Sequence, residues 1–173
     1  MNQQLATLGI TAAMIAARGL CECEEATELE LAETAVDGRQ HLLVPAAAAA
    51  WRQLKAAALA DGVGLFIVSA FRSIDRQFEV LRRKLASDVA LEEALSLCAP
   101  PGYSEHHTGR AVDISSPGSR ALEVEFEQTA AYAWLSRRAA EFGYSLSYPV
   151  GNCLGYQYEP WHWCFHEVKT SGS

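Results

Sequence analysis

Segments that favour helices alternate with short β-prone runs along most of this chain, and no segment of either kind is long. An alanine-rich helix is expected over 46–60, with Pro45 at its favourable first position and Asp61-Gly62 as its stop. The apolar run Leu65–Val68 follows between turn signals and predicts a buried strand. This interleaving predicts the α+β class, as a single domain with a small, mostly antiparallel sheet flanked by helices.

Similar patterns place the remaining elements. Ser73 is a good N-cap for a helix from Ile74 to about Ala86. Further helices are expected over 5–20, 91–97 and 129–142, and further strands over 110–114, 144–147 and 161–167. Residues 21–40 carry six glutamates, so a solvated stretch is expected there, with a weak strand or turn near Asp37-Gly38. We therefore expect residues 1–40 to form a helix and an acidic segment packed on or preceding the domain, and residues 41–173 to form the domain itself.

Composition and charge exclude several classes of partner. The chain has 173 residues, about half of them apolar, which suits one domain with a sizeable core. Its net charge of −7 argues against a nucleic-acid partner, because phosphate binding needs a basic surface. No apolar run reaches the length of a transmembrane span. The apolar segment Leu5–Ala17 lacks a preceding Lys or Arg, and Arg18 follows it, which favours an amphipathic helix over a signal peptide.

The histidines are the residues that point to chemistry. There are five of them, and four form two pairs, His106-His107 and His162…His166, each with a carboxylate nearby. Catalytic zinc is held by three protein ligands, commonly imidazoles and carboxylates, and keeps one position open for water. Each histidine alone is equally well explained as a hydrogen-bonded core or surface residue, whereas the joint pattern favours a metal. The helical H-E-x-x-H motif is absent, because Trp163 stands at the position of the glutamate.

Three blocks of sequence carry a resemblance to a known family. They read S-x-F-R-S-x-x-x-Q, S-x-H-x-x-G-x-A-x-D and E-x-W-H, and their matching residues are Ser69, Arg72, Ser73, Gln77, Ser104, His106, Gly109, Ala111, Asp113, Glu159, Trp161 and His162. In these blocks the chain resembles the VanY-type D-alanyl-D-alanine carboxypeptidases, within the group that includes D-Ala-D-Ala dipeptidases, lysostaphin-type endopeptidases and the hedgehog domain. Phe71 departs from the usual tyrosine of the first block, which removes a hydroxyl. The resemblance implies a hedgehog/D,D-peptidase-like fold.

The resemblance also implies a role for each matching polar residue. It implies a Zn²⁺ ion held by three ligands, namely His106, Asp113 and His162. Glu159 would be the general base, and Arg72 would stabilise the negative charge that grows on the scissile carbonyl. Ser104 and Gln77 would bind the substrate backbone or its terminal carboxylate. The structural alternatives are a surface ion pair for Arg72, a turn cap for Ser104 and a solvated helix position for Gln77.

The function implied is zinc-dependent hydrolysis of the terminal D-alanine of a peptidoglycan stem peptide, in a D,D- or L,D-carboxypeptidase reaction. One alternative is an endolysin-like endopeptidase that cuts within the stem peptide, and another is a non-catalytic zinc-binding module. Glu159 and Arg72 favour an enzyme, since a module that only binds has no need of them.

On strand 161–167, Cys164 and His166 would share a face with His162, where packing is the favoured role of both. The expected partner is a stem peptide or muropeptide, with a bacterial location in the cytoplasm or cell envelope and an open oligomeric state.

Overall fold

The computed structural model describes residues 2–167 of the chain. Its α-helices are α1 Asn2–Thr7, α2 Ala12–Ala17, α3 Pro45–Ala60, α4 Ile74–Leu85, α5 Leu91–Leu97 and α6 Ala130–Arg138. Its strands are β1 Glu30–Thr34, β2 Gln40–Leu43, β3 Phe66–Ser69, β4 Ala111–Ser115, β5 Tyr144–Leu146 and β6 His162–Phe165. Short 3-10 helices are η1 Glu105–Thr108, η2 Val124–Gln128 and η3 Ala139–Phe142.

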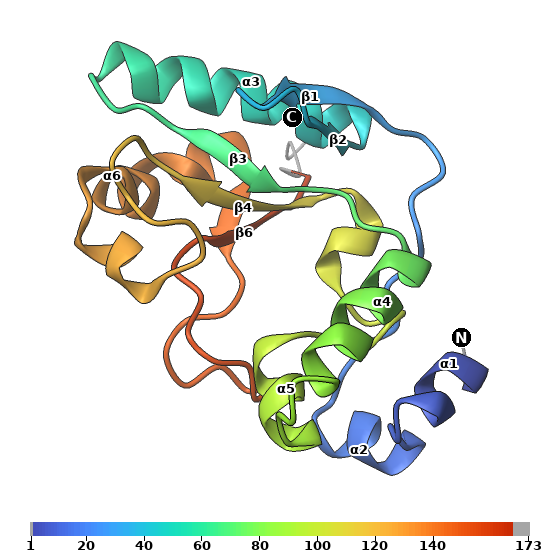
Figure 1. The fold of residues 1–173 in the computed structure, drawn as a ribbon. Helices are drawn as coiled ribbons and strands as arrows, with labels where there is room; N and C mark the ends of the chain where they lie inside the picture. Colours follow the sequence, from blue (N-terminus) through green and yellow to red (C-terminus); the bar gives the residue numbers. More distant parts are fainter. Residues whose placement is uncertain (1, 168–173) are drawn as a thin grey trace, which may run out of the picture.

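The strands form two antiparallel sheets. Four of them make a sheet in the order β3-β4-β6-β5, and β1 pairs with β2 in a separate hairpin. In Figure 1, α3 lies across one face of the four-stranded sheet, while α1, α2, α4 and α5 gather on the other side. The predicted α+β class with a small antiparallel sheet is confirmed.

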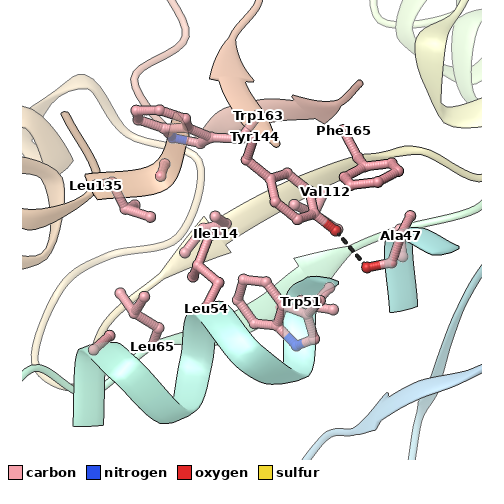
Figure 2. Packing of buried hydrophobic residues seen from close by; sticks show 14 of the residues in the cluster. Ala47, Trp51, Leu54, Leu65, Val112, Ile114, Leu135, Tyr144, Trp163 and Phe165 are labelled. Carbon is pink, nitrogen blue, oxygen red and sulfur yellow. Dashed lines mark hydrogen bonds between the residues drawn. The ribbon is translucent and has the colours of Figure 1, made fainter. Parts of the chain in front are cut away.

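The hydrophobic core lies between α3 and the sheet. Alternate residues of β4 and β6 meet the apolar side of α3, and Figure 2 shows Trp51, Leu54, Val112, Ile114, Trp163 and Phe165 packed together. The Tyr144 hydroxyl donates to the carbonyl of Ala47 at 2.9 Å, which gives this buried phenol a partner. Because side chains alternate along a strand, the residues between these core positions face the opposite side of the sheet. Asp113 and His162 are two of them.

The prediction of one helix over 5–20 is wrong. The chain turns at Gly9, whose φ of +74° is a left-handed conformation that glycine adopts without strain. A second helix then starts at Ala12, with the Thr11 hydroxyl accepting from the Met14 amide. Apolar side chains of α1 and α2 still pack against α4 and α5, as the amphipathic pattern of residues 5–20 predicted. In the described residues no helix combines the length and apolar character that a membrane crossing needs.

The acidic stretch is only partly solvated. Its last part forms β1 and joins β2 through the turn at Asp37-Gly38, where the sequence predicted one. The side chain of Glu33 is 9% exposed and forms an ion pair with Lys55 at 2.8 Å. It also accepts from Trp51 Nε1 at 3.0 Å and from the Ile67 amide at 3.3 Å. These donors offset the cost of burying the charge, so the hairpin is tied to the core through a carboxylate.

Other elements follow the prediction closely. The observed starts of three helices match the predicted ones: α3 begins at Pro45, α4 directly after Ser73 and α5 at Leu91. The Ser73 hydroxyl accepts from the Arg76 amide, as an N-cap does. The helix expected over 129–142 is α6 followed by the tighter turn η3, because regular α-helical geometry ends at Arg138. The strands shift by one or two residues from their predicted ends.

Candidate metal centre

Two neighbouring strands place Asp113 opposite His162. The register of β4 and β6 pairs these residues directly, and both point away from the α3 core. His162 Nδ1 lies 3.0 Å from Asp113 Oδ1, and both side chains are buried. Two residues separated by 49 positions in sequence are therefore brought into contact by ordinary antiparallel pairing.

The third residue comes from the turn η1. The Arg72 amide donates to the His106 carbonyl at 3.1 Å, which fixes the turn against the end of β3. Gly109 ends it at a φ of +65°, and a Cβ there would lie 3.0 Å from Leu29 Cδ2 and 3.2 Å from the Val44 amide nitrogen. This close approach explains why the sequence has glycine at this point. With the turn so held, His106 Nε2 lies 3.2 Å from Asp113 Oδ2.

These three side chains could hold a metal ion. One ligand atom from each of His106, Asp113 and His162 lies within 4.8 Å of the others, and all three residues are buried. Two imidazoles and one carboxylate are the donor set and the number that a catalytic zinc site uses, with a fourth position left for water. The residues singled out from the sequence are therefore brought together at one point.

The orientation of both imidazoles suits a metal between them. His106 Nδ1 lies 2.7 Å from the carbonyl of Ala70, which can only accept, so this nitrogen carries the proton and Nε2 is left as a lone pair. His162 Nε2 lies 3.0 Å from Glu105 Oε2, which leaves Nδ1 to face Asp113. Metal-ligating histidines commonly donate their second N–H to a carboxylate or carbonyl in this way.

Glu105 is a site residue that the sequence interpretation missed. Besides His162, its carboxylate accepts from the Ser147 hydroxyl at 2.6 Å, and the charge is partly buried. The one available signal was its place directly before His106 in the first histidine cluster. Its partner lies 57 positions away, so no local pattern could assign the contact.

The buried charges perturb one another. Burial lowers the pKa of His162, but the hydrogen bonds that its ring donates to the carboxylates of Asp113 and Glu105 outweigh this effect and raise the pKa to about 10. Burial raises the pKa of Glu159 to about 7, and the charge of Asp113 adds to this rise. Glu159 Oε2 lies 3.7 Å from His162 Nδ1, so this carboxylate stands beside the three candidate ligands.

A cleft of about 320 Å³ opens onto the candidate metal centre. Its lining includes every residue for which the sequence analysis expected a catalytic, substrate-binding or metal-binding role, namely Arg72, Gln77, Ser104, His106, Asp113, Glu159 and His162. Arg72 Nη2 makes only a long contact of 3.4 Å with Ser69 Oγ, and the side chain is half-buried. The surface ion pair considered for Arg72 is therefore not what the described residues show.

Ser104 and Gln77 both lie in the wall of this cleft. Ser104 is buried and precedes η1, but its hydroxyl does not cap the turn. Gln77 is 1% exposed, so the interpretation as a solvated helix residue is wrong. Its amide nitrogen donates to the Ala99 carbonyl at 2.6 Å, while within residues 2–167 its Oε1 has no partner. A polar group in this state is a candidate for a ligand contact.

Three tyrosines also line the cleft, Tyr148, Tyr156 and Tyr158, and the sequence interpretation missed them. The Tyr148 ring lies 4.6 Å from the His162 ring and 4.6 Å from the Tyr156 ring, measured between centroids. The Arg18 guanidinium stacks over Tyr156 at 4.4 Å and donates to the carbonyls of Leu154 and Leu95. Arg18, which directly follows α2, therefore links α5 to the loop that carries Leu154 and Tyr156.

The other histidine and cysteine candidates do not join the three ligands. His107 Nδ1 donates to the Arg72 carbonyl at 2.6 Å, and its Nε2 accepts from the Gly102 amide at 3.1 Å. These bonds make it a structural residue of η1. His166 lies beyond the end of β6 and is exposed, while Cys164 is a buried free thiol that does not line the cleft.

Comparison with known proteins agrees with this geometry. A family model described as VanY, D-alanyl-D-alanine carboxypeptidase, matches residues 40–168. A D-alanyl-D-alanine carboxypeptidase of Enterococcus faecalis is 35% identical over 125 residues, which cover 66% of this chain and 45% of that protein. The chain thus spans about half the length of this curated relative.

Solved structures show the same architecture. The LdcB LD-carboxypeptidase superposes with a TM-score of 0.73 and 31% identity, over 82% of this chain and 69% of that one. A mutant of the vancomycin resistance D,D-pentapeptidase VanY in complex with Zn(II) superposes with a TM-score of 0.65 and 27% identity, over 84% of this chain and 82% of that one. The helices and antiparallel strands described above are therefore those of this peptidase fold.

Proposed function

The chain belongs to the VanY family of D-alanyl-D-alanine carboxypeptidases, and on this premise we propose that it is a zinc peptidase that removes the terminal D-alanine from peptidoglycan stem peptides. The observation that carries the proposal is the meeting of two oriented imidazoles and one carboxylate at the floor of a cleft. Residues 41–173 would form the catalytic domain, and residues 1–40 would pack on it or precede it; residues 1 and 168–173 lie outside the described part of the chain.

The proposed zinc ligands are His106 through Nε2, His162 through Nδ1, and Asp113. When bound there, zinc would supply a Lewis acid that activates water and polarises the scissile carbonyl. Binding of the ion through His162 Nδ1 would displace the proton from that nitrogen. Two neutral imidazoles and one carboxylate then leave the ion with a net positive charge, which Lewis-acid chemistry needs. The Ala70 carbonyl and Glu105 support the assignment, because each holds the second nitrogen of one histidine.

Glu159 is the proposed general base. It lies beside the three ligands, is largely enclosed, and is positioned by its own amide, which donates to the Tyr148 carbonyl at 3.1 Å. It would take a proton from the attacking water and later deliver it to the leaving amine. Arg72 would donate to the carbonyl oxygen as negative charge grows there, an effect typically worth about 3–4 kcal/mol of barrier. No covalent intermediate is needed.

Ser104 and Gln77 would hold the end of the peptide. Both are buried and line the cleft, and the Ser104 hydroxyl and Gln77 Oε1 are not committed to other described residues. Tyr148 and Tyr156 line the same cleft, with the Tyr148 ring beside the His162 ring. The matching family model and the similar LdcB structure are both described as carboxypeptidases, which favours removal of a terminal residue over an internal cut.

Product analysis tests this function. Zinc-loaded protein is incubated with a synthetic stem pentapeptide that ends in D-Ala-D-Ala, and the products are identified by mass spectrometry. Loss of one alanine supports the proposal, whereas an internal cut indicates an endopeptidase. The Glu159→Ala protein should keep its zinc and lose turnover by several orders of magnitude. Tight zinc binding with no turnover by the wild-type protein would indicate a module that only binds.

A further inference from the structure

A second hollow adjoins the cleft on the other side of Arg72. Its volume is about 520 Å³, and it lies between the start of β2, the end of β3 and the start of α4. Four residues line both the hollow and the cleft, namely Arg72, Val80, Asp113 and Leu122. The two depressions are therefore continuous, and a peptide whose last residue fills the cleft can extend over Arg72 into the hollow.

The hollow is cationic on a molecule that is otherwise acidic. Three arginines line it, Arg39, Arg72 and Arg76, whereas the whole chain has a net charge of −7. The one carboxylate in its lining is Asp113, whose charge faces the two imidazoles. His41 also lines the hollow, and burial lowers its pKa, so it adds no charge at neutral pH.

Among the three arginines, Arg76 is the one whose guanidinium is exposed and free to bind a ligand. Arg39 forms an ion pair with Asp37 at 2.7 Å, and Arg72 is half-buried, contacts Ser69 Oγ at 3.4 Å and is shared with the cleft. Arg76 is exposed on the first turns of α4, and within residues 2–167 its side chain makes neither an ion pair nor a hydrogen bond. The nearby acids of α4 are engaged elsewhere, since Glu79 pairs with Arg82 and Asp75 accepts from Gln4.

We propose that this hollow is a subsite for a free carboxylate on the part of the peptide that precedes the scissile bond, with Arg76 as its main donor. The proposal rests on the proposed function, which seats the peptide end in the cleft. A guanidinium recognises a carboxylate through two parallel N–H groups, and an open, unpaired arginine is free to make both bonds. The enclosed cleft would select the D-alanine end, and the cationic hollow would select an acidic peptide.

The test compares two peptides on proteins that cannot turn them over. One is a stem pentapeptide with free carboxyl groups on the residues before the D-alanines, and the other carries carboxamides at those positions with the terminal carboxylate unchanged. Their affinities are measured by calorimetry on the zinc-loaded Glu159→Gln protein, alone and with Arg76→Gln or Arg83→Gln added. Arg83 is the matched control, since it is an exposed arginine of α4 that does not line the hollow.

The carboxylate peptide should bind about 3- to 10-fold more tightly, as expected for charge-assisted bonds at a partly exposed site. Arg76→Gln should abolish this preference, Arg83→Gln should retain it, and added salt should reduce it. Equal binding of both peptides, no binding of either, or equal effects of the two arginine substitutions would overturn the subsite. Hydrolysis of the amidated peptide by the wild-type protein tests the proposed carboxypeptidase function without the subsite. The subsite can therefore fail while the carboxypeptidase function holds, and the two failures are distinguishable.

Discussion

At the scale of single residues, the candidate centre depends on side chains that orient others. His106 and His162 each use one ring nitrogen to bind a fixed acceptor, so the other nitrogen faces Asp113. The two acceptors differ in kind. One is the backbone carbonyl of Ala70, which substitution cannot remove, and the other is the side chain of Glu105, which substitution can.

Glu105→Ala should therefore weaken zinc binding. Without the carboxylate, the His162 ring loses the bond that fixes its tautomer and its orientation, and loss of such a partner typically costs 10- to 100-fold in metal affinity. Competition with a chromogenic chelator measures the change. Glu92→Ala, an exposed glutamate at the start of α5, is the control and should bind zinc like the wild type. Unchanged affinity in Glu105→Ala would show that the contact with His162 does not support the metal.

At the scale of elements, α3 supplies one side of the core that fixes β4 and β6. Leu54 is fully buried against the sheet, whereas Leu59 on the same helix is 69% exposed. Leu54→Ala should cost about 2–5 kcal/mol in the free energy of unfolding, from lost burial and the cavity left behind. Leu59→Ala should change it by less than about 0.5 kcal/mol. Urea unfolding measures both, and similar losses for the two variants would contradict the packing described here.

The turn η1 depends on a glycine in a left-handed conformation. Gly109→Ala places a Cβ 3.0 Å from Leu29 Cδ2 in addition to the conformational strain. Gly118 also has a positive φ, of +85°, but a Cβ added there would meet no atom within 4 Å, so Gly118→Ala isolates the strain alone. That strain is about 1–2 kcal/mol. Gly109→Ala should lose more stability than this and should also weaken zinc binding, because His106 precedes the displaced residue. Equal losses in the two variants would refute the steric explanation.

The sequence predicted most elements whose signals are local, such as α3, α5 and the Ser73 cap of α4. It also predicted the three candidate ligands, because the spacing of their motifs resembles that of a known family. Glu105 and Glu33 could not be assigned, since their partners lie far away in sequence and an acidic residue is normally solvated. The break at Gly9 was missed because the apolar pattern continues through it.

At the scale of the whole molecule, Asp61 couples two helices. Its carboxylate follows α3 and accepts from Trp134 Nε1 at 2.7 Å and from Arg138 at 2.6 Å, both in α6. These bonds hold the pKa of Asp61 below its usual value. A lowered pKa stabilises the fold at pH values above the usual one of about 3.9 and loses that effect as the pH falls through the folded value.

Asp61→Asn should therefore be less stable than the wild type near pH 7, and the two should converge in strongly acidic solution. Urea unfolding midpoints collected from pH 7 down to pH 2 measure the difference. Because the carboxylate lies at the surface, the difference should also shrink in high salt. A gap between the two proteins that stays constant over the whole pH range would mean that the ionised carboxylate is not the source of the coupling.

The proposed chemistry depends on two imidazoles and an aspartate that converge from η1, β4 and β6 on one ion. X-ray absorption at the zinc edge of the loaded protein tests this directly, because it reports the number and type of atoms bound to the metal. We predict a four-coordinate ion with two imidazole nitrogens and two oxygens at about 2.0–2.2 Å, one oxygen from Asp113 and one from solvent. Sulfur neighbours at about 2.3 Å, or a protein that takes up no zinc, would contradict this prediction.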